Sequence, residues 1–124
     1  MSYGAARGEQ AREGIVRFGV VTAVDPAAAR AKVSFGGESE SGWLPWLALR
    51  AGAISVWAPP AVGEQVQVVS ASGDTAQGTI HGSLFSEANP GAGNDALFKI
   101  QVGPSSIEID ASGIRIKAPK IDLN

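Results

Sequence analysis

The chain of 124 residues contains no cysteine, one methionine and one histidine, His81. Without cysteine there is neither a disulfide framework nor thiol chemistry, and a lone histidine is typical of a structural or exposed residue rather than a metal ligand. The formal net charge of −2 provides no basic surface for nucleic acid. No apolar run approaches the roughly 20 residues that span a bilayer, and Met1–Arg12 lacks the apolar segment of a signal peptide. We therefore expect no metal, no other cofactor and no nucleic-acid partner.

Turn-forming residues are abundant, with sixteen glycines and seven prolines. This composition favours short elements joined by tight turns over long helices. The length predicts one small domain, with room for a short appendage.

The C-terminal part carries two apolar columns with a period of seven residues. A coiled-coil heptad places its apolar residues at i and i+3, whereas here they lie at i and i+2, on one face of a β-strand. Turn residues separate the units, at Gly103-Pro104, Ser112-Gly113 and Ala118-Pro119. One chain cannot enclose this apolar ribbon, but several copies can, so the pattern predicts an oligomer. The eight residues are Ile100, Ile107, Ile114 and Ile121 in one column and Val102, Ile109, Ile116 and Leu123 in the other.

The rest of the chain divides into three segments. Residues 1–13 are small and polar, and predict a flexible arm or a short helix. Residues 14–83 predict a domain of strands separated by turn signals, and residues 84–96 form a Gly/Asn/Pro linker before the tail at 97–124. Five strands without a convincing helix are typical of a small OB-fold barrel. The predicted strands are 14–24, 30–35, 43–49, 65–70 and 76–82.

Three tryptophans, Trp43, Trp46 and Trp57, are candidates for a ligand-stacking site or for packing in the barrel or between protomers. Stacking of single-stranded nucleic acid requires a basic groove around the aromatic rings. The nearby segments carry three carboxylates and one cation, Arg50, so the sequence favours packing.

The tryptophan segment also resembles a known family, the baseplate assembly protein V family of contractile-tailed bacteriophages. The resemblance implies a homotrimer with an N-terminal OB-fold and a C-terminal triple-stranded β-helix, located at the tip of the tail tube in the virion baseplate. It further implies a tail hub protein as partner above the barrel, and mechanical puncture of the bacterial outer membrane. The matching motifs are Trp43-Leu44-Pro45-Trp46, Arg50-Ala51-Gly52, Trp57, Pro59-Pro60, Val62-Gly63-Glu64-Gln65-Val66 and Gly73-Asp74.

The tip of the tail departs from the family pattern. Many members end in an apex where His-x-His segments from three chains hold iron, but here no histidine follows His81 and the last residue is Asn124. We therefore expect a separate protein to cap the end of a needle whose axis is lined by the eight columnar residues. Each β edge would pair with a neighbouring chain.

Two other classes of function compete with a spike. An OB-fold nucleic-acid or oligosaccharide-binding module leaves the columns unexplained and lacks a basic surface. A cell-wall hydrolase would need a catalytic domain between barrel and tail, where the linker 84–96 is too short to hold one. No carboxylate pair is marked as an acid/base couple, so we expect a structural protein and not an enzyme.

Overall fold

The computed structural model describes residues 15–71, 74 and 76–124. The predicted arm at 1–13 lies outside the described residues, as does most of the predicted turn at 72–74. The chain divides into two compact units, the first ending at Gly91 and the second spanning Ala92–Asn124. Each unit is described by itself.

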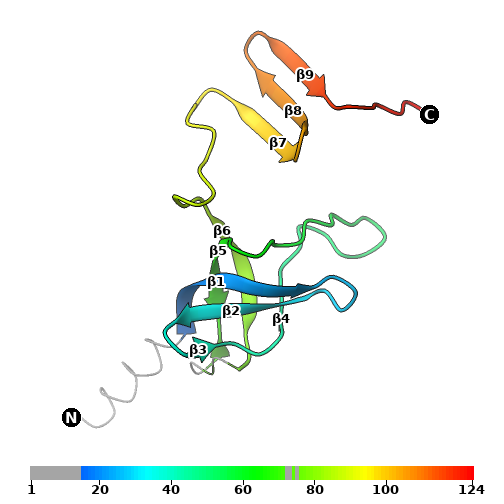
Figure 1. The fold of residues 1–124 in the computed structure, drawn as a ribbon. Coiled ribbons are helices and arrows are strands. Elements are labelled where there is room, and N and C mark those ends of the chain that lie inside the picture. The colour runs from blue at the N-terminus through cyan, green and yellow to red at the C-terminus, as the bar shows by residue number, and fades with distance from the viewer. Residues whose placement is uncertain (1–14, 72–73, 75) are drawn as a thin grey trace, which may run out of the picture. The chain divides into compact units, whose positions relative to one another are not determined.

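The first unit is built on one antiparallel sheet with the strand order β3-β2-β1-β5-β6, and β4 pairs with β2 outside this path. Strand β1 is the longest and lies between β2 and β5, as Figure 1 shows. The strands of this sheet are β1 (Val16–Asp25), β2 (Arg30–Gly36), β3 (Ser39–Glu40), β4 (Leu44–Pro45), β5 (Gln65–Val69) and β6 (Thr79–Leu84).

The core of the first unit lies on the inner face of this sheet. Apolar and polar residues alternate along β2 and β5, so the odd-numbered positions of β2 and the even-numbered positions of β5 point inward. Trp46 and Phe35 pack against the core from its edge. The fully buried apolar residues are Val21, Ala31, Val33, Leu44, Val66, Val68 and Ile80.

The predicted third strand at 43–49 is much shorter in the structure. Only Leu44 and Pro45 pair with β2, because proline has no backbone N–H to continue a ladder. The next residue changes partner: Trp46 forms a parallel bridge with Ile80 of β6, and the Leu47 amide donates to the Ile80 carbonyl at 3.0 Å. The predicted loop after β2 contains the short strand β3, so this sheet has six strands where the sequence predicted five.

The second unit is a three-stranded antiparallel sheet in the order β7-β8-β9. Its strands are β7 (Phe98–Val102), β8 (Ser105–Asp110) and β9 (Gly113–Lys117). Two-residue connections join them, and Gly103 in the first has a left-handed backbone with φ 54, as is common in tight hairpins. Each connection therefore folds the chain back as a hairpin within one copy. The sequence interpretation was that each connection leads the chain around a corner, to the next layer of a prism.

The predicted fourth rung differs from the other three. Ile121 and Leu123 follow β9 without strand assignment. In a single chain they have no neighbouring strand that pairs with them.

A close approach at Gly19 generates the first prediction. A Cβ atom there would lie 2.5 Å from the Ser34 carbonyl oxygen and 2.5 Å from Val33 Cγ1. We expect Gly19→Ala to lower the free energy of unfolding by about 1–3 kcal/mol, the usual cost of forcing extra atoms into a packed site. Gly52→Ala is the matched control, because a Cβ there meets nothing within 4 Å. Denaturant unfolding followed by tryptophan fluorescence measures both, and equal stability of the two variants would contradict the packing at Gly19.

The division into units generates the second prediction. A chain ending at residue 96 should stay folded, because the core residues all lie between Val21 and Ile80. Circular dichroism and amide exchange of the truncated chain test this. A disordered product would show that the first unit depends on the C-terminal sheet.

Candidate functional site

The register of the C-terminal sheet places the apolar columns on one face. Ile107 lies directly opposite Ile100 in β7 and Ile116 in β9, while Ile109 lies opposite Phe98 and Ile114. Residues that lie opposite each other in an antiparallel pair point to the same side of the sheet. The sheet therefore gathers six of the eight predicted axis residues, together with Phe98, which the sequence interpretation missed.

This apolar face, formed by Phe98, Ile100, Val102, Ile107, Ile109, Ile114 and Ile116, is open to solvent in the single chain. The exposed fraction of these side chains runs from 40% at Ile107 to 78% at Val102. A shallow hollow in the face is lined by residues of all three strands, among them Ile100, Ile107 and Ile116. Contiguous exposed apolar surface of this kind marks a site of association.

The opposite face of the same sheet is charged and internally paired. Glu108 in the central strand accepts ion pairs from Lys99 on β7 and Arg115 on β9, each at 3.3 Å. Arg115 also contacts Asp110, with Nη2 2.5 Å from Oδ2. Only 16% of the Glu108 side chain is exposed. These four residues form a ladder across the three strands, which we call the charge ladder.

The charge ladder shifts the titration of its carboxylates. The hydrogen bond from Arg115, followed by the one from Lys99, lowers the pKa of Glu108 below its ordinary value. Arg115 and then Ser112 lower the pKa of Asp110 well below its usual range. The same contacts raise the pKa of Arg115. All of these groups are thus held in their charged forms when the sheet is folded.

The two faces together define what this unit can do. The groups of the charged face pair with one another, whereas the side chains of the apolar face are 40–78% exposed in this unit. Such a sheet is incomplete without a second apolar surface. The sequence spacing indicated the apolar face, but the charge ladder became visible only with the hairpin register, because Lys99 lies nine residues from Glu108.

The three predicted tryptophans occupy different environments in the first unit. Trp46 is half-buried against the core, and its ring lies 5.5 Å from that of Trp57 at an interplanar angle of 55°. Trp57 itself is 59% exposed. Trp43 is also exposed, with the Lys32 ammonium 5.1 Å from its ring centre. The structure thus brings Trp46 and Trp57 together and places Trp43 apart from them.

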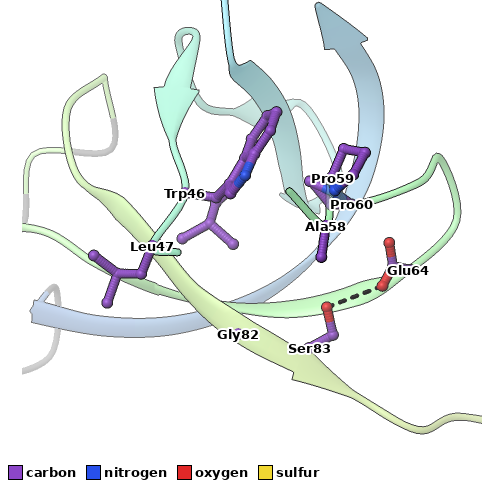
Figure 2. A pocket seen from close by; sticks show the side chains of 9 residues that line it. Trp46, Leu47, Ala58, Pro59, Pro60, Glu64, Gly82 and Ser83 are labelled. Atoms are coloured by element: carbon purple, nitrogen blue, oxygen red, sulfur yellow. Dashed lines mark hydrogen bonds between the residues drawn. The ribbon is translucent and has the colours of Figure 1, made fainter. Parts of the chain in front are cut away.

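A hollow of about 260 Å³ lies beside Trp46. Figure 2 shows the Trp46 ring and Pro59-Pro60 near one another, with Glu64 and Ser83 joined by a hydrogen bond. The Ser83 hydroxyl donates to Glu64 Oε1 at 3.0 Å, and the Ala61 amide donates to Glu64 Oε2. Both oxygens of this carboxylate are therefore engaged in bonds that hold the loop.

The sequence predicted that His81 is a structural or exposed residue and not a metal ligand. It is exposed on β6, and over residues 15–71, 74 and 76–124 no cluster of three or more His, Asp or Glu side chains could hold an ion. Among the same residues, no helix has the length and apolar character needed to cross a membrane.

The architecture defines an all-β protein with two antiparallel sheets, the second of which exposes an apolar face. Residues 17–85, more than half of the chain, match the family described as the type VI secretion system/phage-baseplate injector OB domain. The chain belongs to this family, which confirms the resemblance found in the sequence. It is therefore a structural protein of the phage-baseplate class, as predicted, and not an enzyme.

A curated relative extends the match beyond the OB domain. The chain is 30% identical over 115 residues to the spike protein of Escherichia phage P2, covering 86% of this chain and 54% of that protein. The chain thus spans about half the length of this relative.

The depressed carboxylate pKa values generate the third prediction. A folded-state pKa below the unfolded value stabilises the sheet above the unfolded pKa, and the gain is lost as pH falls toward the folded value. The ordinary values are 4.5 for Glu108 and 3.8 for Asp110, so the sheet should lose stability progressively below about pH 4.5.

Two variants isolate this effect. In the unsubstituted chain, protonation of the charge ladder should lower thermal stability between pH 5 and pH 2, roughly the interval expected for a salt-bridged carboxylate. Glu108→Gln should make this fall smaller. Asp122→Asn is the control, because its pair with Lys120 is more than three-quarters exposed and such pairs contribute little. Thermal melts across this pH range measure the effect. An unchanged pH profile in Glu108→Gln would show that the charge ladder does not stabilise the sheet.

Proposed function

We propose that this chain forms a homotrimeric spike at the centre of a contractile-tail baseplate. In this assembly the apolar faces of three copies close around one axis as an intertwined β-helix prism. Ile100, Val102, Ile107, Ile109, Ile114 and Ile116 line the axis, and Ile121 and Leu123 add a fourth layer when neighbouring copies supply the strands that they lack in the single chain.

The observation that carries the proposal is the contrast between the two faces of the C-terminal sheet. Burial of one isoleucine side chain stabilises a structure by about 2 kcal/mol relative to its exposed state, and the face presents five isoleucines in its strands at 40–65% exposure. The charge ladder lies on the other face, so its ion pairs stay toward solvent when the apolar faces meet. Association therefore buries apolar surface without burying the charges.

The OB domain of the family supports a closed barrel in the first unit. The parallel bridge between Trp46 and Ile80 joins the segment after β4 to β6, and the bond from the Leu47 amide to the Ile80 carbonyl is part of this bridge. With β4 also paired to β2, these bonds connect the two ends of the strand order. We propose that they close the sheet as the barrel predicted for residues 14–83.

The proposed roles follow the domain organisation that we propose. Residues 14–83 form the barrel, residues 84–96 the linker and residues 97–124 the needle. The barrel contacts the tail hub, and the needle transmits the thrust of contraction to the bacterial outer membrane. A close-packed prism suits this role because packed interiors have low compressibility. The separate tip protein expected from the sequence stays a prediction.

A nucleic-acid or oligosaccharide-binding module is the competing function. The Trp46–Trp57 pair is its best structural support, but Arg50 is the only charged side chain that lines the hollow beside this pair. Single-strand binding requires a charged groove along the backbone as well as stacking. The exposed face of the C-terminal sheet has no role in such a module.

The fourth prediction tests the trimer. Ile109→Asp places three carboxylates together on the proposed axis, and each unpaired buried charge costs several kcal/mol. We expect light scattering to show loss of the trimer or a large fall in its melting temperature.

Ser106→Asp is the matched control on the same strand. Ser106 lies opposite Lys117 in the register and belongs to the other face of the sheet, so this variant should stay trimeric. A stable trimer of Ile109→Asp would show that Ile109 does not face the axis.

A further inference from the structure

The first unit exposes a second apolar surface, on the long loop between β4 and β5. Residues 41–63 contain a single charged side chain, Arg50. Four large apolar side chains of this loop, Leu49, Ile54, Val56 and Trp57, are between 45% and 76% exposed. We call these four residues the loop patch.

The loop patch is held in place by backbone bonds. Ala51 and Ser55 form an antiparallel bridge, and the Val56 amide donates to the Arg50 carbonyl at 2.9 Å. A hollow of about 280 Å³ lies between the loop and the barrel, lined by both Trp46 and Trp57 and by Ala29 of the β1–β2 turn. The loop is thus an ordered arm with an aromatic-lined recess.

A third apolar surface lies on the outer face of β1. Val16, Phe18 and Val20 alternate along the strand with exposed fractions of 44–52%. Their neighbours across β5 are uncharged, since Phe18 lies opposite Gln67 and Val20 lies opposite Gln65. We call Val16, Phe18 and Val20 the strand patch.

The two patches lie toward different ends of the first unit. The strand patch occupies the first half of β1, whereas the loop patch adjoins Ala29, beyond the other end of this ten-residue strand. An extended strand rises about 3.3 Å per residue, so its ends are roughly 30 Å apart. Figure 1 shows the β4–β5 loop on the side of the β1–β2 turn, away from the start of β1.

Two different apolar patches at opposite ends of one unit suit a cyclic oligomer. A ring of three copies needs a head-to-tail interface, in which two different patches of each copy meet. We propose that the loop patch of one protomer packs on the strand patch of the next, with Phe18 seated beside Trp57 at the mouth of the aromatic recess. This inference rests on the proposed trimer and names the surface by which its barrels contact one another.

A second copy of this chain is the occupant that the observations favour. About a dozen residues link β6 to β7, and a short linker between associated modules raises the effective concentration of the attached domains to the millimolar range. Neither patch contains a charged residue that would repel its counterpart. An aromatic pair such as Phe18–Trp57 contributes beyond its buried area.

The absence of cysteine makes the contact directly testable. The full-length double variant Phe18→Cys/Trp57→Cys, and a second pair Phe18→Cys/Ile54→Cys, are treated with a short bismaleimide after native mass has been measured. A head-to-tail ring should give covalent trimers as the main product of at least one pair, because each copy then bonds to both neighbours. The single variants Phe18→Cys and Trp57→Cys should give none.

The outcomes separate this inference from the proposed function. A native trimer in which neither pair crosslinks overturns the head-to-tail contact while the trimer stands, and assigns the loop patch to a different protein. Covalent dimers from Phe18→Cys alone indicate like-with-like contact and also overturn it. A native mass other than a trimer contradicts the proposed function itself, and in that case Ile109→Asp should leave the mass unchanged.

Discussion

The period-two alternation of the C-terminal sheet is the constraint from which the proposed assembly follows. Because successive residues point to opposite faces, the seven-residue repeat of apolar pairs collects isoleucine on one side and Lys99, Glu108 and Arg115 on the other. The charged side is completed by its own ion pairs. In the proposed spike the apolar side is completed by other chains, which couples folding of this unit to assembly.

The first unit is held together by a small apolar core and by a connection between two distant strands. Its core is small and lies on the inner face of one sheet, and the Trp46–Ile80 bridge with the Leu47–Ile80 hydrogen bond ties the β4 segment to β6. The same connection leads into a loop with two charged residues, Arg50 and Glu64, and several exposed apolar side chains. Exposed apolar surface of this kind is typical of association sites, and the proposed head-to-tail contact covers it with the next protomer.

Carboxylates have a structural role in both units. The Glu64 carboxylate lies in the hollow beside Trp46 and holds the loop by accepting hydrogen bonds from the Ala61 amide and the Ser83 hydroxyl. The carboxylates in the tail, Glu108 and Asp110, hold strands in register through Arg115. These three carboxylates thus act as ties between neighbouring backbone segments.

The sequence by itself determined the β class, the position of the tail and the residues of its apolar columns, because turn residues and hydrophobic period are local properties. It also carried the family resemblance, through the order of motifs around Trp43 and Trp46. Only the tertiary structure decided which strands pair. The β4 segment turned from β2 to β6 at Trp46, and the hairpin register brought Lys99, Glu108 and Arg115 side by side. The β4 segment and β6 are distant in the chain, and the register of the tail hairpins follows from the turn that each connection adopts, so the apolar pattern alone did not reveal either pairing.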